Sequence, residues 1–213
     1  SLATITVTSL RSVLSHHKKG AVDWDILRQW APGIVAGALV GVLAAAGLKS
    51  SSLMLVFGVL GLIVGLYMAF GRSHWRLGTD MPKGMARAIA SPVLGFLSVL
   101  MGIGGGSFGV PMMTLYGRPI HRAVATAAGF GVLIAVPSVI GFMLSGWDVA
   151  DKPPLTIGYV NLVAFGVIVS MTMLTTPLGV RLAHAMNPRP LKLAFALFIA
   201  LMAANMLRKA LAG

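Results

Sequence analysis

The residues best suited to chemistry in this sequence lie in one glycine-rich stretch, GIGGGSFGVP, at residues 102–111. A glycine inside a helix costs about 1 kcal/mol relative to alanine, so this stretch should end one helix and let a second begin. The free backbone N–H groups and the positive dipole end of a new helix attract anions. The sequence therefore predicts an anion-binding corner made of Gly102, Gly104, Gly105, Gly106 and Ser107.

These glycines have an alternative explanation, which is close packing between helices at small residues. Four glycines within five positions exceed what packing needs, so we favour the anion site. We expect Gly105 in particular to adopt a positive φ, which β-branched residues tolerate poorly. The run also contains a G-x-G-x-x-G pattern, but no strand precedes it and no acidic residue follows about 20 positions later, so a dinucleotide site is not predicted.

An arginine inside an apolar stretch is a second candidate for contact with the ligand. Arg11 lies within TVTSLRSVLS, with Ser9 two residues before it. Because a charged residue inside a membrane is costly, an intramembrane arginine is a functional hypothesis by default. The alternative is that its long side chain extends to the membrane surface near Lys18 and Lys19, about 10 Å away.

A threonine-rich stretch, SMTMLTTPLG at residues 170–179, is the third candidate. Pro177 removes a helical hydrogen bond and can free a carbonyl, so Thr175 and Thr176 could line the same cavity on a kinked helix. The alternative is that both hydroxyls bond to carbonyls of their own helix.

Several kinds of chemistry are disfavoured by what the sequence lacks. It has no cysteine, and its five acidic residues are all aspartates outside the predicted spans, which argues against a carboxylate proton relay or a cation pump. The five histidines fall at predicted membrane boundaries or in loops, without metal-ligand spacing. We therefore expect neither a metal nor a cofactor, and an anion suits the remaining donors best.

The composition is that of an integral membrane protein. Of 213 residues, 57% are hydrophobic and 10% are charged, whereas a soluble domain carries about 25% charged residues. The net charge of +12 is compatible with nucleic-acid binding, but no basic run is long or interleaved with aromatic residues. We therefore expect basic cytoplasmic loops, a lipid bilayer as partner and no nucleic acid.

Apolar segments of about 20 residues predict membrane-spanning helices. We predict helices over 1–16, 30–47, 52–70, 122–145, 157–183 and 191–211. Segment 88–117 differs, because its part after the glycines, about 12 residues, reaches only about 18 Å of the roughly 30 Å hydrocarbon core. We therefore predict a re-entrant hairpin that enters and leaves on one face.

The basic residues favour this hairpin. With it, twelve of them collect on one face: Lys18, Lys19, Arg28, Arg72, Arg76, Lys83, Arg87, Arg118, Arg122, Arg181, Arg189 and Lys192. The other face has four, namely Lys49, Lys152, Arg208 and Lys209, and a full crossing would weaken the division to ten against six. The positive-inside rule makes the twelve-residue face cytoplasmic.

The two halves of the chain also show a weak repeat. ALVGVLAA at 38–45 aligns with TPLGVRLA at 176–183, so that Gly41 matches Gly179 and Phe57 matches Phe195. The matched helices run in opposite directions, and inverted repeats with broken helices are typical of transporters. We predict a first repeat at 1–70, a basic linker at 71–87, a second repeat at 88–213, and a further hairpin upstream of residue 1.

Several stretches resemble one family of membrane proteins. GIGGGSFGVPMMTLYGRPIHRAVATA, then GFMLSGW, then LGVRLAHAMNPRPLKLAFALFIALMAANML are similar to the TauE/SafE permeases, the sulfite exporters, and TSLRSVLSHHKKGAVDW resembles the loop after that family's first helical pair. The resemblance implies a two-repeat fold and movement of small sulfur-containing anions, such as sulfite, sulfonates or thiosulfate, across the bacterial inner membrane. Family members carry a second glycine motif in the first half, which this chain lacks.

The predicted protein is therefore an all-α, polytopic anion permease with two inverted repeats that works by alternating access. The anion is expected at Gly104–Ser107, with Arg11, Ser9 and the threonines as secondary contacts. An anion channel is one alternative. A membrane-embedded enzyme is a weaker one, since no catalytic triad or metal cluster lies within a predicted span. Association into a homo-oligomer is compatible with the sequence.

Overall fold

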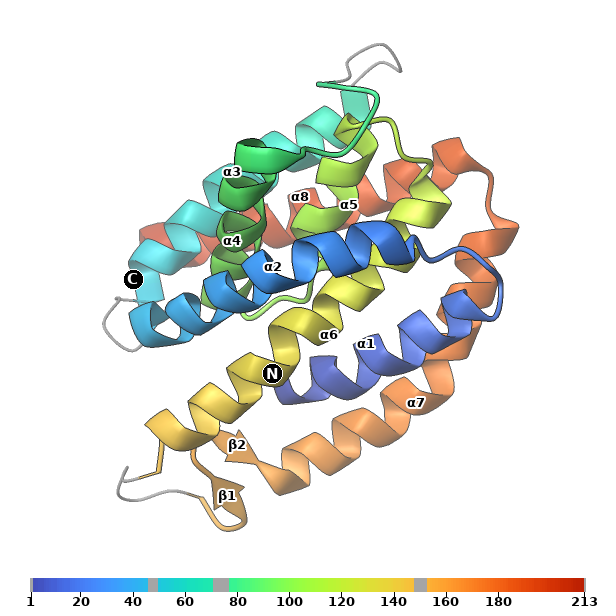
Figure 1. Ribbon diagram of the computed structural model, residues 1–213. Helices are drawn as coiled ribbons and strands as arrows, with labels where there is room; N and C mark the ends of the chain where they lie inside the picture. Colours follow the sequence, from blue (N-terminus) through green and yellow to red (C-terminus); the bar gives the residue numbers. More distant parts are fainter. Residues whose placement is uncertain (1, 46–49, 71–76, 148–152, 213) are drawn as a thin grey trace.

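The protein is an all-α membrane protein, as predicted. The computed structural model describes residues 2–45, 50–70, 77–147 and 153–212 (Figure 1). In these residues the helices are α1 (Leu2–His17), α2 (Trp24–Ala45), α3 (Ser50–Phe70), α4 (Gly84–Leu100), α5 (Gly106–Leu115), α6 (Ile120–Ser145), α7 (Leu162–Ala185) and α8 (Pro188–Ala212). A small antiparallel pair, β1 (Thr156–Ile157) and β2 (Val160–Asn161), precedes α7. Four helices, α2, α6, α7 and α8, are long and apolar enough to cross a membrane.

Two helices begin five or six residues away from the starts that the apolar runs indicate, and side-chain caps explain both shifts. Helix α2 begins at Trp24, six residues before the predicted start, because the Asp23 carboxylate accepts the backbone N–H of Ile26 at 3.4 Å. Helix α7 begins at Leu162 rather than 157, because the Asn161 side chain accepts the N–H of Ala164 at 2.9 Å. In both places the cap outweighs the hydrophobic pattern.

Helices α4 and α5 form the predicted re-entrant hairpin. Helix α4 begins at Gly84, four residues before the predicted segment, and α5 ends at Leu115. The chain enters and leaves the hairpin at the same end of the molecule, since the N–H of Leu77 donates to the carbonyl of Leu115 at 2.9 Å (Figure 1). The hairpin shape is therefore confirmed, and its return to one face of a membrane stays a prediction.

The end at which the hairpin opens also carries most of the described basic residues. We call it the basic end; it holds the C-termini of α1, α5 and α7 and the N-termini of α2, α4, α6 and α8 (Figure 1). The opposite end is called the far end, where Arg208 and Lys209 close α8. The positions predicted for Lys49, Arg72, Arg76 and Lys152 lie outside the described residues.

Small residues let the helices approach one another closely. A side chain at Gly37 would collide with the carbonyl of Pro92, so α2 and α4 meet backbone to backbone. Helix α3 packs along α8 in the same way, where a Cβ at Gly61 would lie 2.8 Å from the Cβ of Ala203. Such small-residue seams are the usual means of packing helices in lipid, where the hydrophobic effect does not drive helices together.

The helix neighbours are compatible with two inverted halves. Helix α1 packs against α6, and α3 packs against α8. The pair α2 and α6 has a counterpart in the pair α7 and α1. These are the pairs that a two-fold exchange of 1–70 with 88–213 would produce. The repeat and its boundaries at 1–70, 71–87 and 88–213 stay predictions.

Candidate functional site

The hairpin turns at mid-height in the molecule, where it touches two other helices. A Cβ atom added to Gly104 would lie 3.0 Å from Cγ2 of Ile5 and 3.8 Å from Oγ of Ser9, so the turn lies against α1. One built on Gly131 of α6 would lie 3.6 Å from the nitrogen of Gly105 and would collide with Ser9 Oγ. Since Ser9 and Gly131 are near the middle of their helices, the break lies far from both ends.

The end of α4 explains why a glycine stands first in the run. The N–H of Ile103 donates to the carbonyl of Ser98 at 3.1 Å, and that of Gly102 donates to Val99 at 2.8 Å. This pair of bonds is a Schellman motif, which needs a residue with positive φ after the helix. Gly102 has a φ of +61° and supplies it. The corner therefore exploits the freedom of glycine at Gly102.

The prediction of a positive φ at Gly105 was wrong. Gly105 has φ −58° and ψ −10°, a right-handed conformation that any residue adopts. It is constrained by space instead, because a Cβ there would lie 2.5 Å from Cβ of Phe130 and 2.8 Å from the nitrogen of Gly131. The packing explanation thus holds at this position. Gly106 is freer, since its Cβ would meet only Cζ of Phe195, at 3.9 Å.

Helix α5 begins with backbone donors that have no helical partner. Its N-cap is Gly105, which offers no side chain, and the N–H of Gly109 makes the first helical bond, to the Gly105 carbonyl at 2.9 Å. The N–H groups of residues 106–108 therefore remain unpaired within the helix. Within the described ranges, no hydrogen bond involves the N–H groups of residues 104 and 105 or the hydroxyls of Ser9 and Ser107.

This arrangement is suited to a small oxyanion. Gly104, Gly106, Ser107 and Ser9 are all partly exposed. Backbone N–H groups at a helix start favour negative charge, and hydrogen bonds to an anion are shorter and stronger than neutral ones. Two residues of this region escaped the sequence analysis: Gly131, and Ser98, whose buried Oγ has no partner among the described residues. A serine in an apolar helix one turn before the glycines was the available signal for Ser98.

The other predicted contacts are not brought to the break. Arg11 is exposed and lies two residues from Ser9, about 200° around the helix. The Thr175 hydroxyl donates to the carbonyl of Met171 at 3.0 Å, and that of Thr176 donates to Thr172 at 2.6 Å, both within α7. The threonines therefore bond as their alternative explanation expected. A role for these three residues with a ligand stays a prediction.

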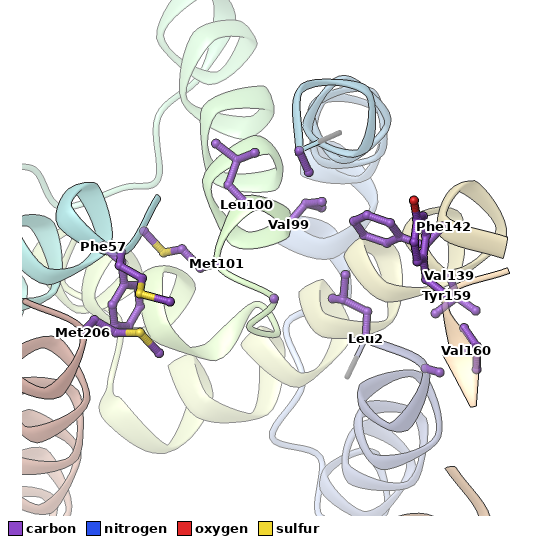
Figure 2. Close-up of a pocket in the computed structure, with 14 residues that line it drawn as sticks. Leu2, Phe57, Val99, Leu100, Met101, Val139, Phe142, Tyr159, Val160 and Met206 are labelled. Carbon is purple, nitrogen blue, oxygen red and sulfur yellow. The ribbon is translucent and has the colours of Figure 1, made fainter. Parts of the chain in front are cut away.

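A largely apolar cavity at the far end of the molecule reaches the break. Its volume is about 420 Å³, and Met101 and Gly102 form part of its wall. Figure 2 shows Phe57 and Met206 on one side of the end of α4, and Val139, Phe142 and Tyr159 on the other. The cavity connects the corner to the surface with few polar groups on the way.

A second cavity, of about 500 Å³, lies at the basic end and is polar. Three aspartates and three basic residues line it: Asp23, Asp25, Asp80, Lys83, Arg118 and Arg122. Arg118 Nη1 lies 3.7 Å from Asp23 Oδ2, and this ion pair joins the start of α2 to the α5–α6 turn. The break thus lies between two cavities at opposite ends.

Comparison with known proteins finds one matching family and several similar proteins. The profile of the family described as Sulfite exporter TauE/SafE matches residues 1–206. A probable membrane transporter protein of Haemophilus influenzae is 30% identical over 209 residues, which are 98% of this chain and 79% of that protein. A probable membrane transporter protein of Methanocaldococcus jannaschii is 23% identical over 97% of this chain and 77% of its own length. The probable membrane transporter protein YunE of Bacillus subtilis is 28% identical over 68% of this chain and 60% of its own length.

No solved structure matches the chain. The family profile covers nearly the whole sequence, and the relatives are described as probable membrane transporter proteins. The four candidate spans and these relatives also support the predicted location, a multi-pass protein of the bacterial inner membrane. The protein is a membrane transporter, and it belongs to the sulfite exporter TauE/SafE family.

Proposed function

We propose that this transporter moves small sulfur-containing oxyanions, of the sulfite, sulfonate or thiosulfate class, and that it binds them at the break between α4 and α5. The observation that carries the proposal is the start of α5, where N–H groups without helical partners meet the free hydroxyl of Ser9 at mid-height. The name of the family, sulfite exporter, supports this class of substrate.

The chemistry of the break favours an anion over a cation. Its polar groups are backbone N–H donors and the hydroxyls of Ser9 and Ser107, and the positive end of the α5 dipole adds to them. The described aspartates, Asp23, Asp25 and Asp80, all line the cavity at the basic end. A cation at the break would therefore find no carboxylate from these residues.

Alternating access is the mechanism that we propose for movement across the membrane. The break lies between an apolar cavity at the far end and a polar cavity at the basic end. Helix α4 packs mainly against α2, so these two helices would move together, sliding along the surface where α2 packs against α6. In this mechanism the anion stays against the start of α5 while access changes from one cavity to the other. No bond in the substrate is made or broken.

The test is sulfite exchange in proteoliposomes, with sulfate and chloride as competing anions. We expect saturable exchange that unlabelled sulfite inhibits and chloride does not. The Gly106→Ala variant should bind sulfite less tightly, because its new methyl group lies beside the N–H donors. Gly166→Ala is the matched control, since Gly166 of α7 has no atom within 4 Å of an added Cβ.

Two outcomes would contradict the proposal. Equal sulfite affinity in Gly106→Ala and Gly166→Ala would remove the break as the site. Flux that never saturates and shows no exchange would indicate a channel instead.

A further inference from the structure

Three histidines from three different helices meet at the basic end. Nδ1 of His16, at the end of α1, lies 2.9 Å from Nε2 of His184, at the end of α7. The ring of His121, at the start of α6, stacks on that of His184 with centroids 5.9 Å apart. In the sequence these residues lie at separate predicted membrane boundaries, and the structure joins them into one cluster.

The surroundings of the cluster are positive rather than acidic. His16 is only 2% exposed, and the Lys19 ammonium interacts electrostatically with both His16 and His184. Among the described residues, no carboxylate lies within ion-pair distance of the three rings. The charged and titratable groups that act on the pair are therefore Lys19 and the third histidine, His121.

The cluster fits a proton better than a metal ion. Nε2 of His121 lies 3.0 Å from the carbonyl oxygen of Met186, so this nitrogen carries a hydrogen and donates it. A metal ion binds a ring nitrogen through its lone pair, which this nitrogen does not have while it carries the hydrogen. In the part of the chain that the structure describes, no group of three such side chains has the geometry to hold a metal.

The hydrogen bond between His16 and His184 limits how many protons the pair can hold. One of the two facing nitrogens must accept, so at least one ring is neutral while the bond exists. When both rings are protonated, both nitrogens are donors, the bond is lost and two positive rings face each other. A second proton can therefore bind only as the rings separate.

The pair also holds a helix that has few other buried contacts. Helix α7 packs against α1 and β2. Among its described residues, Val180 is the one that is fully buried. Val180 lies one turn before His184 on the same side of α7, so it belongs to the part of the helix that the histidine contact holds. Separation of the rings would free this end of the helix.

We propose that His16 and His184, with His121 stacked on them, form a proton-binding site that links protonation to release of the end of α7 from α1 and α6. By linkage, a conformation with separated rings binds one proton more than the conformation seen here, so acidification favours it. The role of this step in anion movement rests on the transport function proposed above. It would give the transporter a proton-dependent change of access at the basic end.

The absence of cysteine from the sequence makes a direct test possible. Val180 is 5% exposed and Leu182, two residues on, is 62% exposed, so single cysteines there are a buried reporter and a matched control. The measurement is the rate of maleimide labelling of purified Val180→Cys, divided by that of Leu182→Cys, at pH 8 and at pH 5.5. The ratio cancels the common effect of pH on thiol reactivity.

We expect the ratio to rise several-fold at pH 5.5. In a His184→Gln background it should stay constant, because glutamine can keep a hydrogen bond to His16 but cannot take a proton. His16→Gln is the second variant, with the same expectation. His17→Gln is the control that should keep the rise, since His17 is exposed and accepts from Nε1 of Trp24 at 3.2 Å instead.

The proposal would be overturned if the labelling ratio did not change with pH when all three histidines are present. It would also be overturned if the ratio rose equally in the His184→Gln and His16→Gln backgrounds. The labelling needs no substrate, so it is independent of the anion proposed above. A pH-dependent ratio without sulfite exchange would support the proton site and contradict the substrate. Sulfite exchange together with a labelling ratio that does not change with pH would support the substrate and contradict the proton site.

Discussion

Replacing Gly105 by alanine separates the structural role of the break from its binding role. The added Cβ would lie 2.5 Å from Cβ of Phe130 and 2.8 Å from the nitrogen of Gly131, both on α6. Real Cβ atoms do not approach so closely, and a helix backbone cannot give way as a flexible side chain can. We therefore expect an overpacking cost of about 1–3 kcal/mol in the free energy of unfolding.

Gly106→Ala should show the opposite effect. Its Cβ would lie 3.9 Å from the nearest atom, Cζ of Phe195, so its stability should stay within about 0.5 kcal/mol of the original protein. The methyl group would instead occupy space beside the donors at the start of α5. Loss of one hydrogen bond to an anion, about 1.5–3 kcal/mol, corresponds to roughly 10- to 100-fold weaker sulfite binding.

The assay is thermal unfolding of both purified variants, without anion and over a sulfite titration. Binding to the folded state raises the melting temperature according to the ligand concentration relative to Kd, so one titration gives both stability and affinity. Gly105→Ala with unchanged stability would refute the packing argument. A Gly106→Ala protein that is destabilised but binds normally would refute the division of roles between the two glycines.

The remaining predictions concern α1 and the hairpin. Ser9→Ala should weaken sulfite binding about 10-fold or more without loss of stability, measured by the same titration; equal affinity would exclude the hydroxyl as a ligand. If Arg11 contacts the anion as predicted, Arg11→Gln should weaken sulfite binding without loss of stability; unchanged affinity would leave the alternative, in which the side chain extends to the membrane surface. An impermeant thiol reagent should label Met85→Cys and Pro119→Cys, both at exposed positions, from one side of the membrane and Trp147→Cys from the other; labelling of the first two from opposite sides would contradict the re-entrant hairpin.

The sequence determined the features that depend on local composition. The apolar runs predicted the number and order of the helices, because the length of a span is set by the thickness of the bilayer. The glycines predicted the break between α4 and α5, since glycine disfavours a continued helix wherever it stands. The distribution of basic residues then indicated that the hairpin returns to its own side.

The tertiary structure decided how these local features are used. Gly102 and Gly105 are alike in the sequence, but one supplies a positive φ and the other a close contact with α6, which only the position of Phe130 reveals. His16 and His184 are 168 residues apart and meet at 2.9 Å because α1 and α7 end side by side. Chain-local preferences act over a few residues, whereas the partner of a buried group is chosen by the packing of whole helices, and no local pattern encodes that choice.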